Sequence, residues 1–246
     1  MELSNRVGCD KLLKKKLEEV KLRIGEATLS NGRSSDDVKL VAVSKKVSAE
    51  RILQAIQLGQ KSFGENYVQE AVEKIKIIHG IINHNNLQVN PEWHFIGQMQ
   101  SNKAKTIAQL FDWVHTVDRL KIAKRLSDAR GELQPKLNIC IQVNTSHEVT
   151  KGGIKYQDVP ALVRDIEDLP NLEMRGFMTI PSKNNFDESV TKQFRRLKKL
   201  MDDFSKVNPR IDTLSMGMSR DLDIAISSGA NLVRVGTAIF GIRGKS

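Results

Sequence analysis

The residues best suited to do chemistry stand at or within short apolar runs. Lys45 follows the run of residues 40–43, and Arg234 lies inside the run of residues 232–235. Burial depresses the pKa of a lysine, so its neutral amine can attack an aldehyde and form a Schiff base. A charge inside a strand costs several kcal/mol unless it is paired. Lys45 is therefore a candidate nucleophile, and Arg234 requires either an internal salt bridge or a ligand as its partner.

Two loops that combine glycine with a hydroxyl side chain follow the last two apolar runs. The first contains Gly217 and Ser219, and the second contains Gly236 and Thr237. Glycine lets the backbone approach a ligand closely, and hydroxyls and free amides at a helix start favour an oxyanion. A helix cap explains either loop alone. Two such loops on neighbouring strands favour a phosphate site.

These groups together describe a ligand with an aldehyde, a phosphate and a polar atom that faces Arg234. Pyridoxal 5′-phosphate (PLP) has all three features. A sugar phosphate on an aldolase-type lysine shares two of them, but it gives Arg234 no obvious partner. The residues therefore favour PLP as the cofactor, with Lys45 as its attachment point.

The elements that must position these residues alternate regularly between short β-branched runs and helical patterns. Such alternation predicts parallel strands with crossover helices, and about eight repeats close a barrel. A doubly wound open sheet is the alternative, but it commonly has a glycine-rich turn after its first strand, and residues 43–50 contain no glycine. We therefore predict an α/β fold, a (β/α)8 TIM barrel, with all strand ends that carry polar residues at one mouth. The expected strands are residues 39–43, 61–63, 93–96, 113–117, 137–143, 172–178, 212–216 and 232–235.

The length of 246 residues suits one large core, so we expect a single domain over residues 1–246. Within it, an extra N-terminal helix should cover about residues 10–30 and the barrel about residues 38–243, because residues 11–27 show apolar positions at helical spacing. The segment of residues 80–92 is expected to be a long surface loop.

The net charge of +10 raises the question of a nucleic-acid partner. The basic residues lie mostly on amphipathic helix patterns and accompany no nucleic-acid motif, so we expect solvated helix faces and no nucleic acid, with a docking module as a third function class. Cys9 and Cys140 provide neither a disulfide framework nor metal-ligand spacing. No apolar segment is long enough to be the core of a signal peptide or to span a membrane. We expect a cytoplasmic protein without membrane contact, with a mitochondrial or other organelle pool left open.

Seven motifs along the chain resemble the pyridoxal-phosphate homeostasis proteins. They are LVAVSK, FGENYVQE, WHFIGQMQSNKAK, QVNTS, RGFMTI, LSMGMSRDLDIAI and VRVGTAIFGIR, which extend from about residue 38 to 243. Members of that family are single-domain relatives of the alanine racemase barrel, which is fold type III among PLP-binding proteins. The resemblance implies the same barrel and the same cofactor here.

The resemblance also implies roles for individual residues. In the family, the lysine after AVS carries the cofactor as an aldimine, and the arginine of RVGT faces the pyridine nitrogen. The SMGMS loop and the GT pair take the phosphate, and two further residues lie nearer the ring. The implied cofactor-binding residues are Lys45, Asn66, Met216, Ser219, Arg234, Gly236 and Thr237.

Whether such a protein is an enzyme or a carrier depends on a second base. Related racemases take this base from a tyrosine on an extra β domain and a partner subunit, and the sequence ends before such a domain. Tyr67 and Tyr156 fall on helical patterns, and His94 on an apolar strand is expected to be structural. We predict a non-catalytic, monomeric PLP-binding protein that serves cofactor homeostasis and contacts PLP-dependent apoenzymes transiently. The alternative is a PLP-dependent amino-acid racemase with weak activity.

Overall fold

The computed structural model describes residues 10–132, 134–146, 148, 151–182 and 187–241. Cys9 and the last two residues of the expected barrel, 242 and 243, lie outside the described residues.

Eight parallel strands close into a barrel, as the sequence predicted. Each strand pairs with the next along the barrel, and closure comes from the pairing of β1 with β9 and of β4 with β5. All eight expected strands are present, four with the expected bounds and four with one or both ends shifted by one or two residues. The barrel strands are β1 (Lys39–Val43), β2 (Ser62–Glu65), β3 (Glu92–Phe95), β4 (Trp113–Val117), β5 (Leu137–Asn144), β7 (Leu172–Met178), β8 (Thr213–Ser215) and β9 (Leu232–Val235).

One further strand, β6 (Ile154–Lys155), was not expected from the sequence. It pairs in parallel with the end of β5, where Val143 faces Ile154. A two-residue strand is too short to show a period of two, so sequence patterning cannot detect it.

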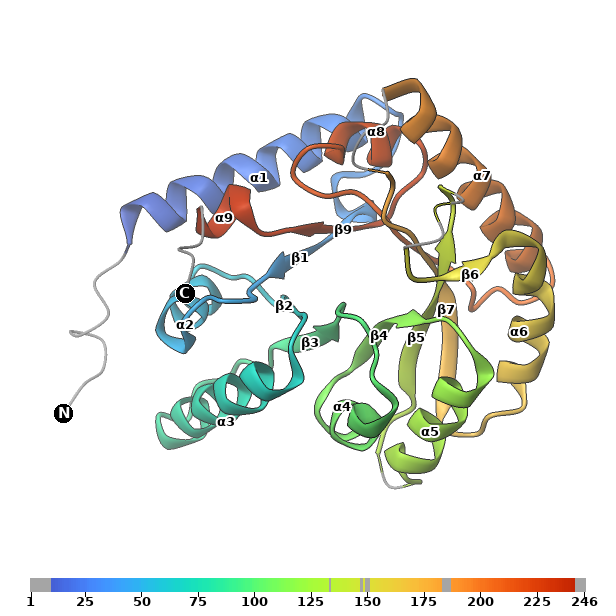
Figure 1. Ribbon diagram of the computed structural model, residues 1–246. Helices are drawn as coiled ribbons and strands as arrows, with labels where there is room; N and C mark the ends of the chain where they lie inside the picture. The colour runs from blue at the N-terminus through green and yellow to red at the C-terminus, as the bar shows by residue number, and fades with distance from the viewer. Residues whose placement is uncertain (1–9, 133, 147, 149–150, 183–186, 242–246) are drawn as a thin grey trace.

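Helices surround the strands on the outside of the barrel (Figure 1). The residues expected as a long loop after α3 are partly helical, because α3 continues to His84 and only residues 85–91 connect it to β3. The α-helices are α1 (Lys11–Leu29), α2 (Ala49–Gln57), α3 (Val68–His84), α4 (Ala104–Leu110), α5 (Leu120–Arg130), α6 (Val159–Glu167), α7 (Asp187–Ser205), α8 (Leu222–Ser227) and α9 (Thr237–Phe240).

The extra N-terminal helix, α1, lies against α8 and α9 (Figure 1). It begins after Asp10, whose carboxylate accepts hydrogen bonds from the backbone N–H groups of Leu12 and Leu13. Its buried apolar positions include Leu17 and Ile24, each contributing roughly 1.5–3 kcal/mol on burial. Leu12, by contrast, is exposed. The helix thus packs next to the two elements that follow β8 and β9.

The apolar side chains form two separate clusters. The large cluster lies where strands meet helices, and a small one consists of Trp113, Cys140 and Met178. Because successive side chains of a strand point to opposite faces, Trp113 shares its face of β4 with His115, which faces the inside of the barrel. The interior of the barrel therefore combines a few apolar side chains with polar ones.

No helix within the described part of the chain combines the length and the apolar character needed to cross a membrane.

Candidate functional site

A cavity of about 610 Å³ opens at the carboxyl ends of the strands. This is the end of a βα barrel at which ligands bind, and the volume falls in the range of about 300–1,000 Å³ typical of small-molecule sites. The cavity is lined by Val43, Lys45, Asn66, Ile96, Ile180, Met218, Ser219, Arg220, Arg234, Gly236, Thr237 and Ala238.

Six of the seven cofactor-binding residues expected from the sequence line this one cavity. They are Lys45, Asn66, Ser219, Arg234, Gly236 and Thr237. Met216 does not line it, because its side chain is fully buried in the large apolar cluster. Met218 and Arg220, which were not expected from the sequence, lie on either side of Ser219 and complete that part of the wall.

The backbone on both sides of Lys45 is held by charged side chains of α3. The Lys74 ammonium donates a hydrogen bond to the carbonyl oxygen of Ser44 at 2.7 Å. Glu70 accepts a hydrogen bond from the backbone N–H of Lys46, which has a φ of +57°. A positive φ is uncommon for a residue with a side chain. Lys45 therefore lies in a turn whose conformation is fixed by its neighbours.

Glu65 completes this buried cluster beneath the turn. Its Oε1 accepts hydrogen bonds from the Ser44 hydroxyl at 2.7 Å and the Lys74 ammonium at 2.9 Å. Lys74 also pairs with Glu70 at 2.5 Å. Burial raises the pKa of Glu65, and the positive charge of Lys74 offsets part of that rise. The two carboxylates and one ammonium thus depend on one another.

Replacing Lys74 with methionine should destabilise the fold by about 3–5 kcal/mol at about pH 7, because a buried carboxylate loses its counter-charge. Without Lys74 the pKa of Glu65 rises further, so Glu65 binds a proton more readily in the folded state than in the unfolded state. The destabilisation should therefore shrink at about pH 5. Urea unfolding at both pH values measures it.

The matched control for that experiment is Lys198→Met. Lys198 pairs with Asp202 one helical turn away on α7, and both side chains are partly exposed. Its loss should cost less than about 0.5 kcal/mol at either pH. Equal losses for the two variants would contradict the role assigned to Lys74.

Arg234 enters the cavity from β9 with only 4% of its surface exposed. Its Nη1 donates to the Ser215 hydroxyl oxygen at 2.6 Å, and its Nη2 donates to the carbonyl oxygen of Thr179 at 3.0 Å. Among the described residues no carboxylate forms an ion pair with it, so an internal salt bridge does not explain this charge. Burial lowers the pKa of Arg234 to about 10, which leaves the guanidinium protonated at neutral pH.

The loop after β8 is shaped by close backbone packing. Gly217 has a φ of +97°, and a Cβ at this position would lie 2.6 Å from the Cβ of Ala225. The carboxylate of Asp221 accepts a hydrogen bond from the backbone N–H of Met218 at 2.6 Å. Glycine is therefore required at 217, and the loop is folded into a tight turn before α8.

The N-terminal helix also contributes to this loop. Arg23 of α1 donates to the carbonyl oxygen of Ser219 at 3.0 Å and to both carboxylate oxygens of Asp223, with the shortest contact at 2.7 Å. The extra helix thus holds the loop that carries Ser219.

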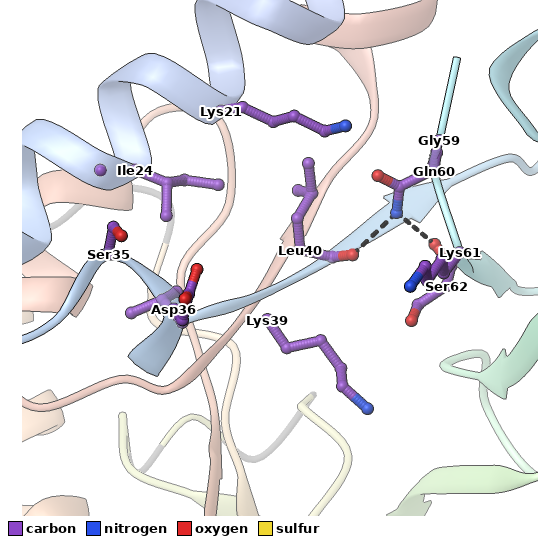
Figure 2. A pocket seen from close by; sticks show the side chains of 12 residues that line it. Lys21, Ile24, Ser35, Asp36, Lys39, Leu40, Gly59, Gln60, Lys61 and Ser62 are labelled. Atoms are coloured by element: carbon purple, nitrogen blue, oxygen red, sulfur yellow. Dashed lines mark hydrogen bonds between the residues drawn. The ribbon is translucent and has the colours of Figure 1, made fainter.

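A second cavity, of about 500 Å³, lies near the amino ends of β1 and β2 beside α1. Gln60 in its wall donates from Nε2 to the carbonyl oxygens of Leu40 and Ser62, both at 2.8 Å (Figure 2). The wall of this cavity also contains three exposed lysines, Lys21, Lys39 and Lys61. This end of a βα barrel serves stability rather than chemistry, and none of the expected site residues lies there.

The sequence matches known proteins over nearly its whole length. Residues 28–244 match the family model for the alanine racemase N-terminal domain. The "Pyridoxal phosphate homeostasis protein" of Vibrio cholerae is 46% identical over 231 residues, which cover 94% of this chain and 96% of that protein. The protein of the same name from Escherichia coli (strain K12) is 44% identical, over 92% of this chain and 95% of that protein. This chain belongs to the pyridoxal phosphate homeostasis protein family.

Solved structures agree with this assignment. PipY of Synechococcus elongatus PCC7942, determined without PLP, has a TM-score of 0.81 and 31% identity, with 93% of this chain and all of that chain covered. The structure of PipY with PLP bound has a TM-score of 0.74 and 32% identity, over 89% of this chain and 100% of that chain. Alanine racemase of Corynebacterium glutamicum shares the fold, with a TM-score of 0.65 at 14% identity over 92% of this chain and 62% of that chain. Members of the homeostasis protein family therefore share the barrel of alanine racemase, and at least one of them binds PLP.

Proposed function

We propose that this protein binds PLP through a Schiff base between the cofactor aldehyde and Lys45, and that it supplies or buffers the cofactor without a turnover reaction of its own. The observation that carries the proposal is the single cavity lined by an amine, a buried guanidinium and two hydroxyl loops. Family membership and the PLP-bound structure of PipY support it.

The donors around the cavity suit a phosphorylated pyridine. Ser219, Gly236 and Thr237 come from the loops after β8 and β9, which hold phosphate in many barrels. Arg220 adds a positive charge beside them. Arg234 stands on the same wall as a hydrogen-bond donor for the ring nitrogen, and Asn66 lies at the end of β2. These assignments give the aldehyde, the phosphate and the ring nitrogen of PLP a partner each.

A racemase with weak activity is the second candidate, because the barrel is shared with alanine racemase. Racemisation requires one group that removes the Cα proton from one face of the substrate and a second group that returns a proton to the opposite face. Among the residues that the structure describes, neither tyrosine lines the cavity: Tyr67 is 51% exposed, and Tyr156 packs against Arg196. Arg234 can only donate to the ring nitrogen, and a racemase could tolerate that arrangement only with a well-placed second base. Steady-state racemisation assays with the loaded protein separate the two.

The phosphate should provide much of the affinity. Charge-assisted hydrogen bonds contribute roughly 1.5–3 kcal/mol each, so unphosphorylated pyridoxal should bind at least about tenfold more weakly than PLP. Isothermal titration of the cofactor-free protein with both compounds measures the difference. Ser219→Ala should reduce the difference in affinity between PLP and pyridoxal. Ser205→Ala, a change at the end of α7, should leave that difference unchanged. Equal affinity for the two compounds would remove the reason for assigning Ser219 and Thr237 to the phosphate.

We further propose that the protein acts as a monomer in the cytoplasm and passes PLP to apoenzymes by transient contact. Light scattering of the purified protein gives its mass in solution. Mixing the loaded protein with a PLP-dependent apoenzyme in the presence of a scavenger for free PLP distinguishes direct transfer from release into solution. Reactivation of the apoenzyme despite the scavenger is the expected result.

A further inference from the structure

A line of polar side chains runs through the inside of the barrel and ends at Arg234. Glu92 and His94 on β3, His115 on β4 and Ser215 on β8 form it. The Glu92 carboxylate lies 2.9 Å from His94 Nε2, and His94 Nδ1 lies 2.9 Å from His115 Nε2. His115 Nδ1 is 2.7 Å from the Ser215 hydroxyl, which in turn accepts from Arg234 at 2.6 Å. Both imidazoles are completely buried.

The far end of this line is a carboxylate surrounded by donors. Glu92 receives hydrogen bonds from the Lys39 ammonium at 2.9 Å, the Ser62 hydroxyl at 2.9 Å and the Trp113 indole at 2.8 Å. Burial alone would raise the pKa of Glu92, but the hydrogen bonds from His94 and Lys39 and the positive charge of Lys39 outweigh it and hold that pKa well below its usual range. Glu92 is therefore ionised and can only accept.

The two imidazoles are neutral at neutral pH, because burial disfavours their charged form. Burial lowers the pKa of His94, although Glu92 partly offsets this. Burial and the nearby positive charges lower the pKa of His115 further. A neutral imidazole has one donor and one acceptor nitrogen. Each ring must therefore donate a hydrogen bond to one neighbour in the line and accept a hydrogen bond from the other.

These constraints leave one arrangement of protons. His94 donates from Nε2 to Glu92, so its Nδ1 must accept from His115 Nε2. His115 Nδ1 must then accept from the Ser215 hydroxyl. The Ser215 oxygen is left to accept from Arg234, which has no acceptor of its own. Every donor therefore points from Arg234 towards Glu92, across the inside of the barrel.

We propose that His94 and His115 are positioning residues whose one-directional hydrogen-bond chain couples Arg234, at the cofactor cavity, to the Glu92 carboxylate at the opposite end of the barrel. The chain fixes the Nη1 side of the guanidinium and aligns dipoles that stabilise a buried charge without an adjacent carboxylate. This inference rests on the proposed function only where it assigns the remaining donors of Arg234 to the ring nitrogen of PLP.

The proton arrangement is tested first in the cofactor-free protein by ¹⁵N NMR of the histidine rings. We expect both buried rings to be neutral and protonated at Nε2, with His94→Gln and His115→Gln variants used to assign the signals. Glu92→Gln should shift the ring signals of His115, which Glu92 does not contact. Asp212→Asn removes a carboxylate at the same end of the barrel that pairs with Arg175, off the chain, and should leave them unchanged.

The coupling to the cavity is tested with PLP. Glu92→Gln should raise the dissociation constant by about three- to tenfold and shift the absorbance of the bound cofactor, whereas Asp212→Asn should do neither. At the middle of the chain, His115→Leu should weaken binding more than His115→Gln, because glutamine keeps one acceptor and one donor. This pair decides the matter if Glu92→Gln fails to fold.

The outcomes separate this inference from the proposed function. A ring of His94 or His115 that is charged or protonated at Nδ1, or identical effects of Glu92→Gln and Asp212→Asn on signals and affinity, would overturn the chain. If the glutamine variant fails to fold, equal binding by His115→Leu and His115→Gln would do the same. In each case the proposed function would stand as long as the protein binds PLP at Lys45. Absence of PLP binding by the unmodified protein would overturn the proposed function and leave the NMR result valid.

Discussion

Replacing Lys45 with alanine will abolish covalent attachment of PLP while leaving the fold intact. Only a primary amine can form the Schiff base that borohydride reduces to a permanent bond. The backbone on both sides of this residue is held by Lys74 at Ser44 and by Glu70 at Lys46. Intact-mass spectrometry after reduction should show a stoichiometric adduct on the unmodified protein and none on Lys45→Ala. The variant should keep weak, reversible binding, because the phosphate loops and Arg234 are unchanged.

The neighbouring lysine provides the matched control. Lys46 is exposed and occupies the same turn, and its side chain is not part of the cavity wall. Lys46→Ala should therefore carry the full adduct. Peptide mapping that placed the adduct on another lysine of the unmodified protein would remove the central claim of the proposed function.

The barrel was predictable because its strands are buried on both faces. Runs such as residues 39–43 and 137–143 are nearly continuous in apolar residues, and their alternation with helical patterns defines the topology. The strands β1 and β5 lie where these runs predicted. The end of α3 was missed because Asn83 and Asn85 suggested a loop, whereas the buried Ile78 and Ile82 keep the helix packed to its end.

The gathering of the expected residues around one cavity was predictable, because the carboxyl ends of the strands in a βα barrel meet at one mouth. Lys45 and Thr237 are far apart in sequence, yet both follow barrel strands and line one cavity. Met216 shows the limit of this argument. It directly follows Ser215, whose hydroxyl faces the barrel interior, and the alternation of side chains turns Met216 towards the helices. Its expected place near the cofactor ring is not supported by its burial.

The polar clusters could not be foreseen from the sequence. His115 and Ser215 are 100 residues apart, and their contact depends on the size and register of the closed barrel. The one signal was Arg234 itself, since an inward charge requires polar partners in the same layer. His94 was expected to be structural. In the structure its ring is buried in the barrel interior and hydrogen-bonds to His115.

Arg234 should determine both the affinity of the protein for PLP and the low reactivity of the bound cofactor. PLP accelerates chemistry at Cα by drawing electrons into a protonated pyridine, commonly kept so by a carboxylate. A guanidinium that stays protonated at neutral pH can only donate to an unprotonated ring nitrogen. The electron sink is then shallow, which suits a protein that must hold PLP without consuming amino acids.

Arg234→Gln should therefore weaken cofactor retention by about tenfold or more and shift the absorbance of the bound cofactor, because a charge-assisted hydrogen bond is lost. Arg234→Lys should restore the charge but not the full affinity, since an ammonium cannot contact Ser215, Thr179 and the ring together as the planar fork does. Equilibrium dialysis and visible spectra of the three proteins measure both effects. Arg175→Gln, which removes an arginine from the opposite end of the barrel, is the control and should bind PLP normally. Unchanged affinity and spectrum in Arg234→Gln would mean that Arg234 serves the barrel interior alone, and the electronic argument for a carrier would be lost.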